Sequence, residues 1–240
     1  MTAFRLLLLL IVSSLIAGCA STGTRYSTSV NAISGDSKYS SPGVSCIVLP
    51  GKENTRIDDL EFREYSVLAS KALQENGFIV TDDPKKADIA VFLDYAISTP
   101  KQETTTDVIP TFGQTGYSSA NTYGNYNPYS GSYQGTTYYT PSYGVTGYTP
   151  VTVTHTYYTR VIIFDAREII KNDGDAKLGK QAWKVITTSH GTSGDLRRVF
   201  PYLVVASKNH LGKNTGKAIE IEVSEKDPAV IAFTGLQPEK

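Results

Sequence analysis

Apolar residues recur in short segments from Val44 onward, and their spacing predicts a domain of strands and helices. Continuous apolar runs predict buried strands, whereas strict alternation with polar residues predicts strands with one exposed face. An Asn-Asp-Gly-Asp turn over 172–175 joins two of these segments as a hairpin. The strands expected from these patterns are 44–49, 78–80, 87–95, 151–165, 181–189 and 217–223.

Two further segments carry apolar residues at three- and four-residue steps, which predicts helices with one buried face. The first runs from Leu60 to Leu73 and is expected to end at Gly77. The second follows Ser193 or Asp195, either of which can cap it, and Pro201 is expected to kink or split it. The fold class predicted is α+β: a single mixed or antiparallel sheet with two main helices packed on it.

Two regions lack this patterning. Residues 20–43 are rich in Ser, Thr, Asn and Gly, and 19–43 is predicted to be a flexible tether. Residues 99–150 form a low-complexity insertion with nine Tyr between 117 and 148, where Lys, Arg, Asp, Glu, Leu and Ile are absent. Because this insertion has no aliphatic face to bury, we expect it to be disordered. The α/β core domain is therefore expected over 44–98 and 151–235.

The first residues resemble the signal of bacterial lipoproteins. Arg5 precedes an apolar stretch over 6–16, and Ile16-Ala17-Gly18-Cys19 has the form of a lipobox. The stretch is much shorter than the roughly 20 residues of a membrane-spanning helix. The resemblance implies removal of residues 1–18 and a lipid anchor on Cys19. Ala20, in place of an Asp, implies sorting to the outer membrane, and we expect a periplasm-facing protein.

The core carries a weaker resemblance. A long helix is followed by Gly77-Phe78-Ile79-Val80, a few polar residues and Ala87-Asp88-Ile89. This order resembles the small α/β domains of envelope lipoproteins, and is distantly similar to the N-terminal domain of the Tol-system protein TolB and to the curli secretion lipoprotein. The resemblance implies a role in envelope interaction or assembly.

Charge and reactive residues exclude several classes of function. The chain has 23 Lys and Arg against 23 Asp and Glu, without the basic surplus of a nucleic-acid binder. Cys46 lies in an apolar strand and is expected to be a core residue. His155, His190 and Asp165 are the residues on which a hydrolase or metal enzyme would depend, but their spacing matches no zinc or catalytic motif. We therefore expect no enzyme, no metal and no cofactor.

The tyrosines of the insertion are the remaining candidates for function, since Tyr rings supply contact area at low entropic cost. The chain is thus interpreted as a non-enzymatic envelope lipoprotein, anchored to the membrane through Cys19, that binds an envelope protein partner. The alternative is a surface-exposed protein that acts through its Tyr-rich loop. Solvated, disordered filler remains a further interpretation of that loop. The tyrosines proposed for interaction are Tyr123, Tyr126, Tyr129, Tyr133, Tyr138 and Tyr139.

Overall fold

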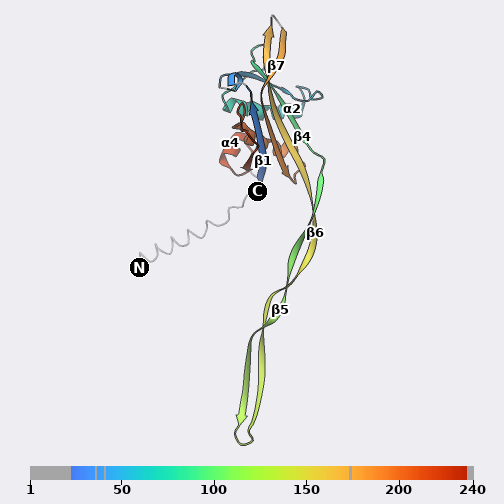
Figure 1. The fold of residues 1–240 in the computed structure, drawn as a ribbon, viewed down its shortest axis with the longest axis vertical. Coiled ribbons are helices and arrows are strands. Elements are labelled where there is room, and N and C mark those ends of the chain that lie inside the picture. The colour runs from blue at the N-terminus through green and yellow to red at the C-terminus, as the bar shows by residue number, and fades with distance from the viewer. Residues whose placement is uncertain (1–22, 36, 41, 173–174, 237–240) are drawn as a thin grey trace, which may run out of the picture. The chain divides into compact units, whose positions relative to one another are not determined.

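The computed structural model describes residues 23–35, 37–40, 42–172 and 175–236, and these form two units. One unit is an α+β domain built from the described residues up to Pro100 and from Tyr157 onward, and the other spans Lys101–Thr156. Strand β6 belongs to both (Figure 1). The elements are β1 (Arg25–Ser34), η1 (Ser37–Tyr39), β2 (Ser45–Pro50), α2 (Leu60–Glu75), β3 (Ile79–Val80), β4 (Ile89–Ile97), β5 (Lys101–Asn127), β6 (Ser132–Asn172), β7 (Asp175–Gly191), α3 (Leu196–Lys208), β8 (Ile219–Ser224) and α4 (Pro228–Thr234).

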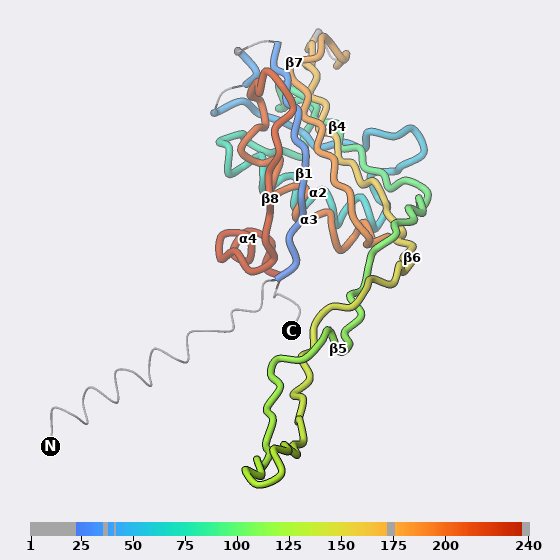
Figure 2. The backbone as a smooth tube through the Cα atoms, turned by 60° about the horizontal axis from the view of Figure 1, so that its bottom comes forward, coloured from blue at the N-terminus to red at the C-terminus, as the bar shows by residue number. Residues whose placement is uncertain are grey.

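A mixed sheet forms the first unit, in the order β3-β2-β4-β6-β7-β1-β8. The pairs that include β2 are parallel, and the other described pairs along this order are antiparallel. Helices α2 and α3 pack together beside the sheet (Figure 2). The Tyr65 ring of α2 stacks on the Phe200 ring of α3, with the ring centroids 3.9 Å apart. The predicted α+β class and mixed sheet are therefore confirmed, and α4 is a third, shorter helix.

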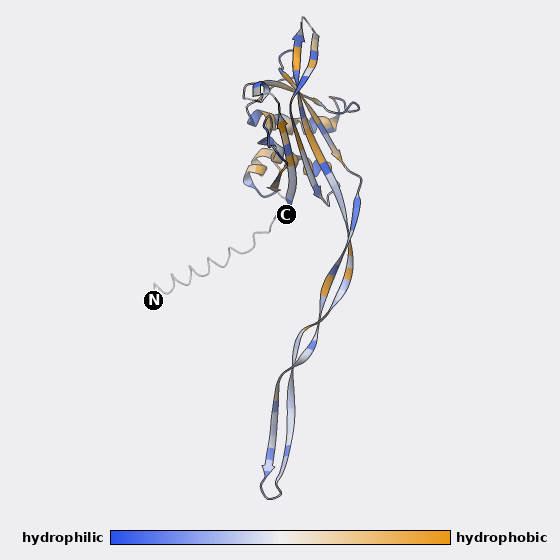
Figure 3. Ribbon diagram, in the orientation of Figure 1, coloured by the Kyte–Doolittle hydropathy of each residue, from blue (hydrophilic) through white to orange (hydrophobic). Residues whose placement is uncertain are grey.

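The core lies between the sheet and these helices. Alternate residues of β6, among them Ile162, Phe164 and Ala166, are fully buried, and Trp183 of β7 is 1% exposed. Figure 3 shows the strands of this domain rich in hydrophobic residues. Cys46 is fully buried on β2, as predicted for a core residue.

The helix boundaries follow local chemistry. Asp195 caps α3, and its carboxylate accepts a hydrogen bond from the Arg198 N–H at 3.2 Å. Gly77 follows the end of α2 with a φ of 84°, a left-handed conformation that favours glycine. Pro201 does not split α3, which runs as one helix from Leu196 to Lys208.

The prediction of a tether over 19–43 is wrong for residues 25–34, which form β1. This strand pairs with β7 on one side and β8 on the other. Its alternate residues Tyr26, Thr28, Val30 and Ala32 are buried. Sequence reasoning missed the strand because half of its members are Ser, Thr or Asn, which hide the period-two pattern.

The prediction of disorder over 99–150 is also wrong, because β5 pairs with β6 to form a two-stranded ribbon. Thr, Tyr and Val favour extended backbone, and cross-strand pairs stabilise it without a buried core. Thr122 and Thr137 form such a pair, with hydroxyls 2.8 Å apart. At the turn the Gly131 N–H donates to the Asn127 carbonyl at 2.9 Å, and Gly131 has a φ of 68°. We call residues 101–156 the ribbon.

Candidate functional site

Cys19, the predicted lipidation site, lies outside the described residues, as does the predicted signal peptide. Within the described part of the chain, no helix has the length and hydropathy needed to cross a membrane. The candidate site that the structure does describe is the surface of the ribbon.

The six tyrosines predicted for interaction are all exposed on the distal part of the ribbon. Tyr129 is at the turn and is fully solvent-exposed. The Tyr123 and Tyr138 rings lie 6.1 Å apart, edge to face. Tyr139 packs at 5.0 Å against Tyr117, a ring that the prediction did not include. The rings therefore form neighbouring pairs across the two strands, which an unordered loop would not provide.

Tyr133 has a geometry of its own. A Cβ atom built on Gly135 would come within 2.8 Å of the Tyr133 Cε1 atom, and one built on Gly124 within 2.5 Å of Cζ. The ring thus lies over two glycines on opposite strands, while 58% of the residue stays exposed. It lines a shallow hollow together with Tyr123 and Tyr126. An aromatic ring that lies against the backbone and is otherwise exposed to solvent can stack on another planar or apolar surface.

The ribbon surface is also without formal charge over most of its length. Between Asp107 and Arg160 the sequence has no Lys, Arg, Asp or Glu. Figure 3 shows the distal half of the ribbon in pale, intermediate hydropathy. Natural sheet edges are protected by charged residues, particularly Lys, which this segment lacks. The segment instead contains Pro110, Pro141 and Pro150, each of which lacks a backbone N–H to donate to a neighbouring strand. Residues 111–127 of β5 contain no proline and form an uninterrupted stretch.

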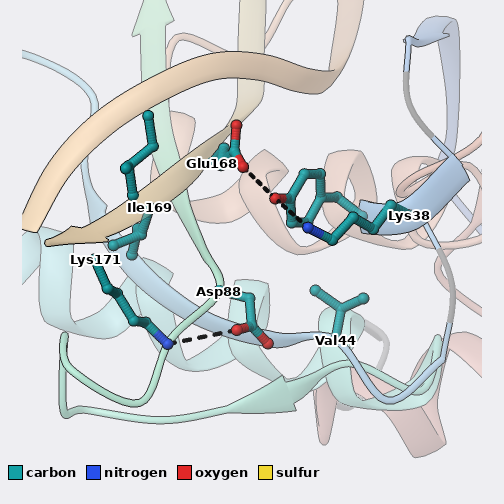
Figure 4. A pocket seen from close by; sticks show the side chains of 8 residues that line it. Lys38, Val44, Asp88, Glu168, Ile169 and Lys171 are labelled. Carbon is teal, nitrogen blue, oxygen red and sulfur yellow. Dashed lines mark hydrogen bonds and ion pairs between the residues drawn. The ribbon is translucent and has the colours of Figure 1, made fainter.

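The α+β domain also contains a polar pocket of about 420 Å³, which is an alternative candidate site (Figure 4). The Tyr39 hydroxyl donates to Glu168, and Lys38 donates to the Tyr39 hydroxyl at 3.0 Å. Asp88 accepts from the Ser45 hydroxyl at 2.5 Å and pairs with Lys171 at 3.5 Å. Hydrogen bonding to Glu168 raises the pKa of Tyr39, which keeps the phenol protonated. The pocket therefore holds one ion pair and one hydrogen-bonded chain, and its two lysines balance its two carboxylates in formal charge.

The residues proposed for metal or hydrolytic chemistry have separate roles. The His190 Nδ1 atom lies 3.0 Å from the Thr159 hydroxyl, and Asp165 accepts from Gln181 at 2.7 Å. His155 lies in the other unit, on the ribbon. The described residues contain no group of three or more His, Cys, Asp or Glu able to hold a metal ion. Burial raises the pKa of the Cys46 thiol to about 12, which keeps it protonated and unreactive.

Comparison with known proteins found no matching family model and no matching curated protein. One solved structure, a PDZ domain protein from Parabacteroides distasonis, aligns over 89% of this chain with 11% identity and a TM-score of 0.38. The chain spans 42% of the length of that protein.

Proposed function

We propose that this chain is a non-enzymatic, lipid-anchored envelope protein that binds its partner through the ribbon. The observation that carries the proposal is an ordered two-stranded sheet with exposed tyrosine rings, no formally charged side chain beyond Asp107 and two unpaired strand edges. Strand β6 belongs in part to the ribbon and in part to the α+β domain.

The ribbon has little to stabilise it on its own. An isolated two-stranded hairpin is only marginally stable in water, and a third strand or a packed face is normally needed. The ribbon supplies unpaired backbone donors and acceptors along its edges, which is the geometry used in strand addition by partner proteins. Tyr side chains add contact area with only two rotatable angles to fix. A bound partner would therefore stabilise the ribbon as well as be held by it.

The nature of the surface restricts the partner. Between Asp107 and Arg160, the part of the ribbon that carries the tyrosines has no Lys or Arg with which to neutralise a polyanion. Affinity would come from ring contacts and backbone hydrogen bonds, and would change little with ionic strength. A protein strand or another neutral surface fits these terms.

The anchor gives the α+β domain a restricted position relative to the lipid. Strand β1 begins at Arg25, only six residues after Cys19. A chain of that length spans at most roughly 20 Å when fully extended. If Cys19 is acylated, the β1 end of the domain is held beside the headgroups, rather than at the end of a long tether.

The test is crosslinking in cells from a photoreactive residue placed at Tyr129. We expect a specific crosslinked partner, and we expect it to disappear when the five other predicted tyrosines are changed to Ser. The matched control changes the same five to Phe, which keeps ring area and should retain most crosslinking. A photoreactive residue at Leu60 on α2, which is 80% exposed, reports on the domain instead. A partner captured only from Leu60 would overturn the proposal.

A further inference from the structure

Arg160 is a buried cation at the end of a row of core positions. It continues the inward-facing series of Ile162, Phe164 and Ala166 on β6, and it is only 2% exposed. Its Nη1 atom donates to the Ser193 carbonyl and its Nη2 atom to the Ser189 hydroxyl, both at 3.0 Å. The Nε atom is buried and has no hydrogen-bond partner in the protein.

The charge of Arg160 is not balanced by a carboxylate. No ion pair joins it to an acidic residue anywhere in the described ranges. Burial lowers the pKa of Arg160, but an arginine side chain stays protonated at every physiological pH. Burying a charge without a partner costs a large free energy, so we expect an anion to bind beside this guanidinium.

The surroundings of Arg160 fit such a ligand. A pocket of about 300 Å³ is lined by Arg160 together with Arg25, Arg198 and His190. Arg25 lies 3.5 Å from Glu222, and Arg198 lies 3.6 Å from Glu225. These two pairs leave Arg160 as the unbalanced charge. The remaining polar lining is hydroxyl or backbone: Thr24, Tyr26, Gly191, Thr192 and Ser193.

We propose that this pocket binds a phosphate-type oxyanion, with Arg160 as its main charged contact. A guanidinium presents donors in a planar fork that matches phosphate oxygens, and neighbouring hydroxyls can complete the coordination. Gly191 is part of the site, because a Cβ built there would come within 2.9 Å of the Arg160 Nη2 atom. This site does not depend on the ribbon.

The phosphate has two possible sources. One is a free phosphate or phosphate ester in solution. The other is a phospholipid headgroup, because Thr24 and Arg25 line the pocket and are five and six residues from Cys19. Only this second source rests on the proposed lipid anchor.

The experiment measures thermal unfolding of the unlipidated mature chain, residues 20–240, in sodium phosphate or in sodium chloride of equal ionic strength. Phosphate should raise the Tm in a saturable way, because a ligand that binds only the folded state stabilises it. Arg160→Met keeps the volume and removes the charge, so its Tm should not respond. Arg197→Met is the matched control: this exposed arginine pairs with Glu64 and is not part of the pocket lining, and the response should persist.

A second variant and a second readout keep the test decisive if Arg160→Met does not fold. Gly191→Ala should weaken the phosphate response at least severalfold, because the methyl group displaces the guanidinium. In the wild-type protein, the NMR signal of the Arg160 Nε–H group should shift with added phosphate. Equal Tm responses to phosphate, acetate and chloride, or an unmoved Nε–H signal, would overturn the proposal.

The two sources are separated by vesicle sedimentation of the same unlipidated chain. Binding to phosphatidylglycerol vesicles that is competed by inorganic phosphate and lost in Arg160→Met supports a headgroup. A Tm response without vesicle binding supports a soluble phosphate. Absence of any phosphate response in the wild-type protein, with intact crosslinking from Tyr129, would disprove this site and leave the proposed function standing.

Discussion

The α+β domain and the ribbon are built from similar strand-forming residues, yet different interactions hold them together. The domain buries a continuous apolar core, in which Phe164, Leu73 and Trp183 are at most 1% exposed. The ribbon is held by backbone pairing and by contacts among exposed side chains such as the Tyr117–Tyr139 pair. Burial thus specifies the first unit and backbone pairing the second. The ribbon, which lacks a buried core, is therefore the unit whose aromatic side chains remain exposed to solvent.

The largest effect is expected from the core. Phe164→Ala should reduce the free energy of unfolding of the domain by about 3–5 kcal/mol, because it removes a fully buried ring and leaves a cavity. The matched change on the ribbon is Tyr143→Ala, at a residue that is 73% exposed, and should cost at most about 0.5 kcal/mol. Urea unfolding followed by Trp183 fluorescence measures both. Similar losses would show that the ribbon is part of the cooperative core.

The contrast also explains what the sequence could predict. Helices α2 and α3 were predicted because their apolar spacing reflects burial on one face. Strand β4 was predicted because its run Ile89-Ala90-Val91 is continuously apolar, and these residues are buried on both faces of the sheet. Strand β1 was missed because Thr28 is a buried polar residue and Ser27 and Ser29 flank it. The ribbon was missed because aliphatic content measures core formation, and pairing between β5 and β6 does not require a core.

The details of both candidate sites depend on register, which composition does not contain. Tyr133 lies over Gly124 and Gly135 only because the two strands pair at that position. Arg160 is buried because β6 continues its inward alternation, and the Ser193 carbonyl accepts a hydrogen bond from its guanidinium. The sequence signal available for the Tyr133 site was the presence of glycines close to a tyrosine. No local sequence pattern indicates the burial of Arg160.

The second-largest effect concerns Cys46, which reports on the integrity of the domain core. Burial raises its pKa from the ordinary value of 9.0 to about 12. The folded state therefore holds the thiol proton more tightly than the unfolded state does. The stabilisation is complete below pH 9 and is lost as pH rises from about 9 towards 12, by up to about 1.4 kcal/mol per pH unit.

The check compares the alkaline pH dependence of stability in wild type and in Cys46→Ala, which cancels the contribution of other titrating groups. The wild-type curve should fall more steeply above pH 9. Alkylation of Cys46 by iodoacetamide at pH 8 should also require unfolding. Rapid alkylation of the folded protein would mean that the core around β2 opens readily.

A smaller effect is expected from removing the ribbon. Replacing residues 101–156 by a short Gly/Ser turn should change the stability of the α+β domain by less than about 1 kcal/mol, since the deleted residues are almost entirely exposed. The pairing of β4 with β6 continues up to Ser98 and Thr159, where the Ser98 N–H donates to the Thr159 carbonyl at 2.8 Å. Calorimetry should show one cooperative transition near the wild-type Tm. Its loss would mean that the ribbon contributes to the core.

The smallest change tests whether binding depends on the position of the Tyr133 ring on the ribbon. Gly135→Ala adds one methyl group against the Tyr133 ring, where a Cβ would lie 2.8 Å from Cε1, and it should leave domain stability unchanged. The ring must move off the strand, so the NMR signals of Tyr133 should shift and crosslinking from Tyr129 should fall severalfold. Gly147→Ala is the control, because a Cβ there meets no atom within 4 Å. Equal behaviour of the two variants would show that binding does not use the Tyr133 ring in this position, and would favour the backbone edges of the ribbon as the binding element.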